Sequence, residues 1–425
     1  MRAALRIAIV GYGTGGQSAA VLLSRDGHRV EVFERAPVLG PVGAGFLLQP
    51  IGQAVLWEMG LLEAALAHGA RISSLYGETA DGRPVMDMRY AELHPRLFGL
   101  GLQRGALFEL LDAAWTEQRV LHRGHRIVDI DTERGTLVDD EGRRHAGFDL
   151  VIVADGAASS LRAKVAAPTF DRPYPWGAQW CLAPMGDWHR PDVLGQRYVR
   201  ARRMAGMLPV GTRPGDPVPR LSFFWSLPAD ALARVDIDAD AWRREVGAVW
   251  PEALERLAGI DVPTGLAQAR YRDAMHARWR QGRAVLLGDA AHAMSPQLGQ
   301  GVNMALLDAQ ALRDALRAER ETSAALQRYE RGRRAHLAAY HFWSRALTPL
   351  FQSEHDGWAR LRDATFHPLS RLPGARRMML RVLTGTRRGW LSTHALPAGF
   401  VAALAGLPAM PLRDGPPREA AAQAE

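Results

Sequence analysis

A run of glycines followed by an acid is the first pattern in the chain that suits ligand binding. Gly11, Gly13 and Gly16 follow an apolar stretch and open an amphipathic one. Glycines at this spacing permit a tight turn, close approach of a pyrophosphate and close packing of the next helix, whose N-terminus faces the phosphates. Glu34 follows about 20 residues later, where a carboxylate accepts hydrogen bonds from a ribose diol and repels a 2′-phosphate. The pattern predicts a dinucleotide and disfavours NADPH at this position.

A second pattern lies in the C-terminal half of the chain, where R-A-V-L-L-G-D-A-A-H-A-M-S-P-Q-L-G-Q-G-V-N occupies residues 283–303. Asp289 follows an apolar stretch, and a loop containing Pro296 leads to glycines that open a helix. This order presents a carboxylate to hydroxyl groups and backbone N–H groups to an anion. A ribityl chain and a reduced flavin require these two things, so the pattern indicates a flavin.

Strands and helices are expected on either side of both patterns. Residues 6–10 and 29–33 predict strands flanking a helix at 17–25, which is a βαβ beginning. Apolar runs at 148–153 and 284–287 predict further buried strands of a parallel sheet. The other expected elements are helices at 52–67, 105–118, 301–319 and 323–340, a hairpin of 72–76 with 84–88 around Asp81-Gly82, and helices broken at prolines over 342–404.

Composition narrows the function classes. The chain of 425 residues has a formal charge of +8, but its arginines are spread along the whole length, which argues against nucleic-acid binding and is consistent with attraction of anionic cofactors and an anionic substrate. A genome that favours Arg codons is the alternative explanation, since Lys164 is the sole lysine. Cys181 is the sole cysteine, so we expect no intrachain disulfide and no metal site. We expect a cytoplasmic protein, because the first residues run straight into a strand without a signal peptide and no apolar run of about 20 residues could insert into a membrane.

The two patterns, together with D-G-A-A-S-S-L-R at residues 155–162, resemble the class A flavoprotein monooxygenases typified by para-hydroxybenzoate hydroxylase. The resemblance covers about residues 6–340. It implies an α/β fold, in which a Rossmann-like FAD-binding domain carries an inserted, mainly β substrate domain and C-terminal helices. The expected boundaries are 1–70, 98–170 and 275–340 for the FAD-binding domain, 71–97 and 171–274 for the substrate domain, 341–412 for the C-terminal helices, and 413–425 for a disordered tail.

The resemblance also implies roles for individual residues. No side-chain base is assigned, and for His292 both a structural role and proton transfer stay open. Arg104 matches an arginine that contacts FAD in the family, with a surface arginine at a helix start as the alternative. The FAD-binding residues implied by position are Gly11, Gly13, Gly16, Glu34 and Arg35 at the ADP half, Gly45 and Arg104 near the flavin, Asp155 and Gly156 near the pyrophosphate, Gly288 and Asp289 at the ribityl chain, and Pro296, Gly299, Gln300, Gly301, Val302 and Asn303 around the ring, with Pro296 and Gly299 forming the catalytic environment.

The activity implied is hydroxylation. NADH or NADPH reduces FAD, oxygen adds at flavin C4a, and the resulting hydroperoxide transfers one oxygen atom to an electron-rich aromatic or heteroaromatic small molecule. The substrate, oxygen and NAD(P)H would be the partners of a monomer or homodimer. Phe223 and Trp225 are two apart on an expected strand and so share one face, which fits either an aromatic substrate pocket or an ordinary sheet core.

Other functions on the same scaffold stay open. Epoxidation and Baeyer–Villiger oxidation use the same or a closely related flavin peroxide. A flavin-dependent halogenase needs a lysine in an early segment, whereas Lys164 follows the Asp155-Gly156 motif, and the halogenase W-x-W-x-I-P signature is absent. A flavin-free binding protein would have little need of the Gly288-Asp289 pattern. The C-terminal helices could touch a membrane or a partner subunit, or serve as a cap or dimer contact.

Overall fold

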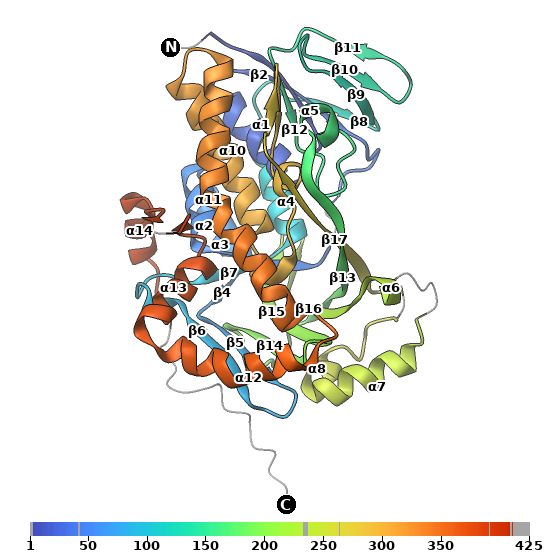
Figure 1. Cartoon of the computed structure of the whole chain (residues 1–425), viewed down its shortest axis with the longest axis vertical. Coiled ribbons are helices and arrows are strands. Elements are labelled where there is room, and N and C mark those ends of the chain that lie inside the picture. Colours follow the sequence, from blue (N-terminus) through green and yellow to red (C-terminus); the bar gives the residue numbers. More distant parts are fainter. Residues whose placement is uncertain are drawn as a thin grey trace, which may run out of the picture.

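The structure is a computed structural model that describes residues 3–40, 43–232, 237–262, 264–390, 392–408 and 410. The expected tail at 413–425 lies outside these residues. Two large sheets follow one another along the long axis, with long helices along one side (Figure 1), and three smaller sheets of two or three strands accompany them in the described part of the chain. Within the described ranges, no helix combines the length and the apolarity that crossing a membrane requires.

The first sheet has six strands in the order β18-β19-β12-β1-β2-β8. β1 (Arg6–Val10) pairs in parallel with β2 (Arg29–Glu34) and β12 (Leu150–Val153), and β12 pairs in parallel with β19 (Ala284–Leu286). α1 (Thr14–Arg25) joins β1 to β2 and packs beside α10 (Gly301–Ala318). The expected βαβ unit and both later strands are confirmed. Two short edge strands, β8 (Val120–Arg123) and β18 (Arg280–Gln281), complete the sheet.

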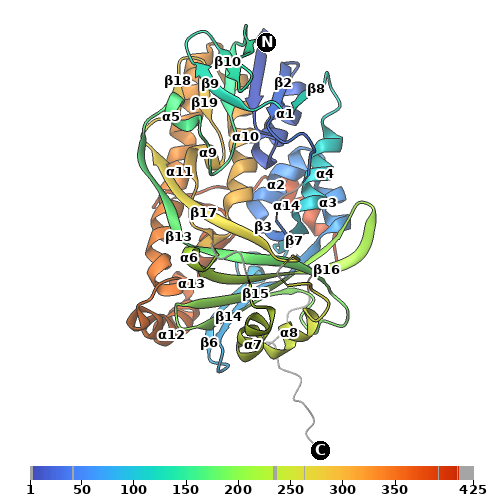
Figure 2. The ribbon, with the colours of Figure 1, turned by 90° about the vertical axis from the view of Figure 1, so that its right-hand side faces the viewer.

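The second sheet has seven strands in the order β17-β13-β16-β15-β14-β5-β6. All neighbours are antiparallel except β5 and β14, which run parallel. The expected hairpin is confirmed, because β5 and β6 pair antiparallel. Gly82 in the turn between them has a φ of 80°. Figure 2 shows β13 and β17 running from the region of the first sheet down into the second. The strands are β5 (Ser74–Thr79), β6 (Pro84–Arg89), β13 (Pro168–Pro184), β14 (Val193–Val199), β15 (Arg203–Arg213), β16 (Asp216–Pro228) and β17 (Ala267–His276).

Four helices follow α10 in the described C-terminal part. α11 (Thr322–Phe351) continues 11 residues beyond the expected end, and α12 (Asp356–Arg371), α13 (Pro373–Leu383) and α14 (Ala398–Ala405) come after it. The expectation that prolines break these helices was wrong for Pro349 and Pro368, which lie inside α11 and α12. Each lies in the last turn of its helix, which ends two or three residues after the proline.

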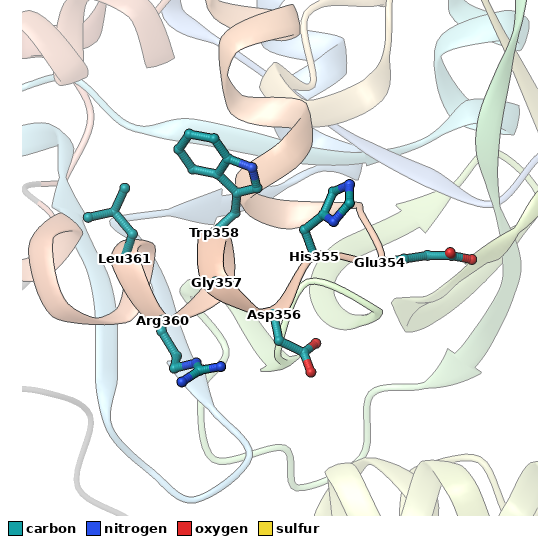
Figure 3. Close-up of a pocket in the computed structure, with 7 residues that line it drawn as sticks. All are labelled: Glu354, His355, Asp356, Gly357, Trp358, Arg360 and Leu361. Carbon is teal, nitrogen blue, oxygen red and sulfur yellow. The ribbon is translucent and has the colours of Figure 1, made fainter.

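A shallow hollow surrounds the start of α12 (Figure 3), lined by Glu354, His355, Asp356, Gly357, Trp358, Arg360 and Leu361. It lies at the lower end of the molecule in Figure 1 and contains none of the residues expected to bind FAD, so it is not the expected flavin site. The expected helix at 52–67 is two helices separated near Gly60, which has a φ of 70°. The remaining elements are β3 (Gly45–Leu48), α2 (Pro50–Glu58), α3 (Leu62–His68), β4 (Ala70–Ile72), β7 (Gly99–Gln103), α4 (Arg104–Ala114), β9 (Ile127–Asp131), β10 (Thr136–Asp139), β11 (Arg144–His145), α5 (Arg162–Val165), α6 (Ala229–Leu232), α7 (Ala239–Val249), α8 (Pro251–Arg256), α9 (Asp289–His292), β20 (Arg387–Arg388), β21 (Ser392–Thr393) and the 3-10 turns Tyr90–Glu92 and Pro296–Leu298.

Candidate active site

The glycines between β1 and α1 divide into two kinds. Gly11 has a φ of 101°, and a Cβ there would lie 2.5 Å from the carbonyl oxygen of Ala154. A Cβ on Gly16 would lie 2.0 Å from the carbonyl oxygen of Gly11. A Cβ on Gly13, by contrast, would meet no atom within 4 Å. The first and last glycines therefore serve the packing of the turn, and the middle one leaves open space in front of the α1 N-terminus, as a bound pyrophosphate requires.

Glu34 is held at the carboxyl end of β2 beside this turn. Its Oε2 accepts a hydrogen bond of 2.8 Å from the backbone N of Tyr12, and its Oε1 accepts one of 2.9 Å from the backbone N of Ala36. These bonds fix the carboxylate, and each oxygen keeps a lone pair for a ribose hydroxyl. Arg35, next to it, is exposed. Glu34 therefore lies against the glycine turn, as the pattern of turn and acid predicted, and the role of Arg35 beside the adenosine stays a prediction.

Asp289 begins α9 directly after β19. Gly288 precedes it with a φ of 63°, and the half-buried Asp289 carboxylate lies near the first turn of α10, where a Cβ on Gly301 would be 3.9 Å from its Oδ1. Gly299 adopts a left-handed conformation, with φ of 60°, and faces open space. The carboxylate and the N-terminus of α10 are thus neighbours, which supplies the two features that a flavin needs.

Arg104 starts α4 and approaches the same region. Its backbone N donates to Ala44 O at 2.9 Å, and its guanidinium lies 5.9 Å from the centre of the Phe46 ring. Burial lowers the pKa of Arg104, an effect that nearby Tyr271 and Asp289 oppose, although the side chain keeps exposed surface. The arginine is exposed at the start of α4, with its side chain next to Gly43, and its contact with FAD stays a prediction.

The motif after β12 is tied to the Asp289 loop. Gly156 has a φ of 85° and faces open space, and the half-buried Asp155 has its Oδ1 without a hydrogen-bond partner in the described part of the chain. Burial raises the pKa of Asp155. The buried Arg162 donates to the carbonyls of Gly156, at 3.0 Å, and Ala157, and reaches Asp289 O at 3.4 Å. One arginine thus links the two motifs.

The side-chain amides of Gln300 and Asn303 form hydrogen bonds with other parts of the protein. Asn303 is fully buried, and its Oδ1 accepts a hydrogen bond of 2.8 Å from the backbone N of Gln49. Gln300 Nε2 donates to Leu383 O at 2.7 Å, which ties the loop to the end of α13. The backbone N–H groups around Gly299 to Val302 are therefore the candidates for contacting a flavin, rather than these two amides.

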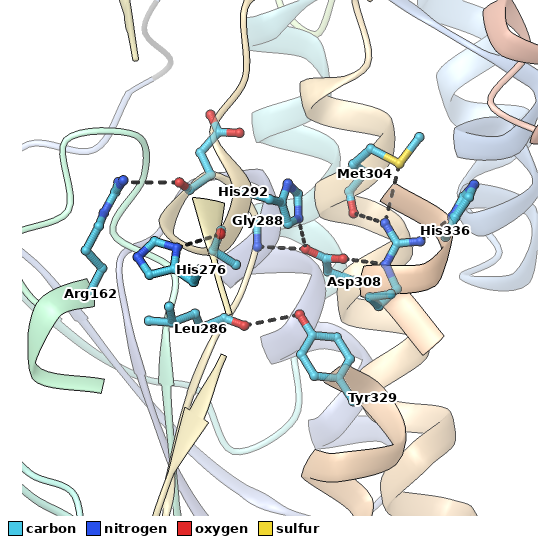
Figure 4. Close-up of polar contacts among 12 residues, drawn as sticks. Arg162, His276, Leu286, Gly288, His292, Met304, Asp308, Tyr329 and His336 are labelled. Atoms are coloured by element: carbon cyan, nitrogen blue, oxygen red, sulfur yellow. Dashed lines mark hydrogen bonds and ion pairs between the residues drawn. The ribbon is translucent and has the colours of Figure 1, made fainter. Parts of the chain in front are cut away.

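A buried carboxylate that the sequence analysis missed organises the whole loop (Figure 4). Asp308 on α10 is fully buried and accepts from Gly288 N at 2.8 Å, His292 Nε2 at 2.6 Å and Arg333 Nε at 2.5 Å. Burial alone would raise the pKa of Asp308, but His292 and Arg333 outweigh it and lower the pKa to about 2. His292 is 2% exposed, so this position favours its structural role. An acid within the apolar L-L-D-A run of a helix was the available signal.

The two faces of β16 have different neighbours. Phe223 and Trp225 do share a face, as expected, but they are 0% and 1% exposed within a cluster under α7 and α8, where Phe223 packs edge-on against Trp242 at 6.0 Å. Assigning them to a substrate pocket therefore needs correction, since this packing supports the sheet-core interpretation. The opposite face carries Ser222, whose Oγ accepts from Gly45 N at 3.1 Å, and so it faces the flavin motifs.

Aromatic and neutral polar side chains occupy this opposite face. Trp180 packs 5.1 Å from the ring of Phe224, and its Nε1 donates to Tyr271 Oη at 3.2 Å. Gln297, directly after Pro296, donates from Nε2 to Tyr174 Oη at 3.2 Å. Tyr174 Oη in turn contacts Thr348 Oγ1 at 3.2 Å and Gln352 Oε1 at 2.8 Å, and Gln352 Nε2 donates to Ser226 Oγ at 2.7 Å. The sequence analysis missed these residues because they come from five distant segments.

Fold and site together define a flavin-binding oxidoreductase, and the comparisons with known proteins agree. The model of the family described as "FAD binding domain" matches residues 4–343. The FAD-dependent urate hydroxylase of Klebsiella oxytoca is 30% identical over 340 residues, covering 77% of this chain and 85% of that protein. The aurachin C monooxygenase/isomerase of Stigmatella aurantiaca is 29% identical over 343 residues, covering 78% and 85%.

Among solved structures, Klebsiella pneumoniae HpxO in complex with FAD and uric acid matches with a TM-score of 0.75 and 22% identity, covering 88% of this chain and 97% of that one. The match supports the fold. The chain belongs to the FAD-binding-domain family, and it is an FAD-dependent monooxygenase with NAD(P)H as its reductant.

Proposed function

We propose that this chain hydroxylates a planar, electron-rich heteroaromatic or aromatic molecule held between the flavin and the inner face of the second sheet. The observation that carries the proposal is the open space at Gly13, Gly156 and Gly299, three glycines of three separate motifs. FAD extended from Glu34 to the α10 N-terminus would occupy this space. The residues present therefore fit the cofactor.

Bound FAD supplies the activation of oxygen, and the protein supplies position and electrostatics. Glu34 would orient the ribose, Asp289 would accept hydrogen bonds from the ribityl hydroxyls, and the N-terminus of α10 would stabilise negative charge on the reduced ring. The protein must also keep water from the reacting oxygen. The seven-stranded sheet would do so as a cover over the ring.

The inner face of that sheet suggests the substrate class. Trp180 and Tyr271, which are both half-buried, offer ring surfaces, while Gln297 and Tyr174 offer neutral hydrogen-bonding groups; the buried Phe224 supports the ring of Trp180 from behind. Such a set suits a flat ring with neutral N–H, O–H or C=O groups. Urate, named in one relative's activity, is a heterocycle of this kind.

The single lysine argues against a halogenase. Lys164 Nζ forms a 2.9 Å ion pair with Asp129 Oδ1 on β9, and both side chains are half exposed to solvent. A lysine relay would have to face the reaction space near Pro296 instead. We further propose a cytoplasmic protein that works as a monomer or homodimer.

The test is a visible spectrum of the purified protein combined with NADH and NADPH oxidation across phenols, anilines, quinolones and purines, with hydrogen peroxide assayed in parallel. We expect yellow protein whose oxidation rate rises with one ring class, with little peroxide and one oxygenated product. Colourless protein that does not take up added FAD would contradict the proposal. Rapid NAD(P)H oxidation that yields only peroxide with every ring would reject the substrate class but not the cofactor.

A further inference from the structure

The outer side of α12 is unusually apolar for a surface helix, although its inner side also carries apolar residues such as Phe366, which packs 5.5 Å from the ring of Phe351. Trp358, Leu361 and Leu369 on its outer side, and Leu372 directly after it, are 47%, 47%, 46% and 57% exposed. At 3.6 residues per turn, these four positions fall within an arc of about 80°. Surface helices normally turn such a stripe towards the core. Here it faces outward.

The inward side of α12 also carries a charge. Arg362 is fully buried, and its guanidinium lies 4.7 Å from the centre of the Tyr198 ring and 5.2 Å from that of Phe351. It also donates to Leu350 O at 3.1 Å and pairs with Asp363 at 2.7 Å. The fold therefore buries an arginine completely while a tryptophan and three leucines remain about half exposed. Exposed apolar stripes of this kind mark interaction sites.

Charge on the same helix indicates the occupant. Arg360 and Arg371 are exposed on the flank of the stripe, and Asp363, which Arg362 neutralises, is the only acid between residues 357 and 372. Asp356 at the helix start is paired with Arg200 and Arg202. The face is thus apolar and positive, on a chain with a formal charge of +8.

We propose that α12 docks on the surface of an anionic lipid bilayer. A helix of Trp and Leu bordered by Arg is suited to lie in the plane of the interface, with its apolar face among the acyl chains and its cations at the phosphates. The stripe from Trp358 to Leu372 is about 21 Å long at 1.5 Å per residue. A second copy of the chain is the weaker candidate, because a two-fold axis on this stripe would bring the arginines of both copies together.

Figure 1 shows α12 lying across one end of the molecule, far from the α1 N-terminus and the expected FAD site. Docking there would leave the cofactor motifs unobstructed. α12 lies outside residues 4–343, which the family model matches. Docking on a bilayer would therefore be a property of the C-terminal part of this chain.

The experiment is co-sedimentation of the full-length, FAD-loaded protein with vesicles of phosphatidylcholine alone or mixed with phosphatidylglycerol. We expect binding to the mixed vesicles that weakens as salt is added. The double variant Trp358→Ser with Leu361→Ser should lower the partition coefficient at least about tenfold. Arg360→Gln with Arg371→Gln should lower binding to anionic vesicles and abolish most of its salt dependence.

The matched control removes apolar area elsewhere. Val120 and Val218 are 41% and 43% exposed on other elements, so Val120→Ser with Val218→Ser should bind vesicles as the wild type does. Circular dichroism and FAD content of every variant show whether it folds. Equal binding by stripe and control variants would overturn the proposal. Absence of vesicle binding by the wild type would overturn it as well. If the wild type instead sediments as a dimer and the Trp358→Ser, Leu361→Ser variant as a monomer, this face binds a second copy of the chain.

Discussion

His292 Nε2 lies 2.6 Å from Asp308 Oδ2, and the two side chains are 2% and 0% exposed. The same carboxylate accepts from Gly288 N and from Arg333, so one buried anion joins α9, α10 and α11 behind Asp289. The loop that we propose to bind the ribityl chain therefore has its geometry set by a buried residue of α10.

Replacing this anion should unfold the loop. We expect Asp308→Asn to lower the free energy of unfolding by about 3–5 kcal/mol, because it leaves Arg333 as an unpaired buried charge, and to weaken FAD binding as Gly288 shifts. Urea unfolding and FAD titration measure the two effects. Asp314→Asn on the same helix removes a half-exposed partner of Arg313 and should cost no more than about 1 kcal/mol. Equal losses in both variants would show that Asp308 has no special role.

His336 predicts a pH dependence of stability. Its side chain is buried, with Nδ1 2.5 Å from Arg333 Nη1 and Nε2 3.1 Å from Gly385 O. The ring of His394 stacks on it, with the two ring centres 5.9 Å apart. Burial, followed by the charge of Arg333, lowers the pKa of His336 to about 3. The unfolded histidine takes up its proton near pH 6.5, so the folded state loses stability as the pH falls from 6.5 towards 3.

This one residue should contribute up to about 1.4 kcal/mol per pH unit in that window. Urea unfolding at pH 7.5, 6.5 and 5.5 would measure the slope in the wild type and in His336→Gln. We expect a shallower slope in the variant. Parallel slopes would mean that other groups, such as His341, whose pKa is also lowered by burial to about 3, dominate the acid sensitivity.

Gly13→Val separates cofactor binding from folding. Gly13 has a φ of −78°, which any residue tolerates, and its Cβ would meet open space. We expect the variant to fold with an unchanged melting temperature when free of FAD, and to bind FAD at least about tenfold more weakly, because the valine fills the space left for the pyrophosphate. Gly332→Ala on α11, whose Cβ also meets open space, is the control and should leave FAD binding unchanged. Loss of folding in Gly13→Val would contradict this division.

Adjacent phenylalanines on β16 should behave differently. Phe223 packs under α7, so Phe223→Leu should lower stability by about 1–3 kcal/mol and leave the KM for the aromatic substrate unchanged. Phe224 packs against Trp180 on the inner face, so Phe224→Leu should change that KM several-fold. Steady-state kinetics and thermal unfolding of both variants provide the comparison. A KM effect confined to Phe223→Leu would reverse the assignment of the two faces.

The sequence predicted best what is local. The strand, glycine turn, helix and acid from Arg6 to Glu34 depend on neighbours in the chain, and so does the turn from Gly288 to Gly301 into α10. The correct face of β16 could not be read in this way, because both sides of L-S-F-F-W-S-L are partly apolar and only Ser222 and Ser226 distinguish them. Asp308 was missed for a related reason, since its partners lie 16, 20 and 25 residues away.

The prolines show another limit. A proline is a strong local signal for ending a helix, yet Pro349 and Pro368 are followed by two and three further helical residues. Tertiary contacts decide the outcome, since Gln352 beyond Pro349 is buried and bonded to Ser226 at 2.7 Å. Site residues supplied by such distant contacts are visible only in the folded chain.

The length of α11 has a consequence for protein engineering. Three residues of α11 hydrogen-bond to other parts of the chain: Tyr329 to Leu286 O on β19, Arg333 to Asp308 on α10, and Ser344 to Ser295. Gln352, directly after the helix, donates a hydrogen bond to Ser226 on β16. Inserting a single residue near the middle of α11 would rotate every later contact by about 100° around the helix axis. A chimera that exchanges the seven-stranded sheet for that of a relative must therefore keep the number of residues between Tyr329 and Gln352. Otherwise the contacts of α11 with the first sheet and with β16 cannot both form.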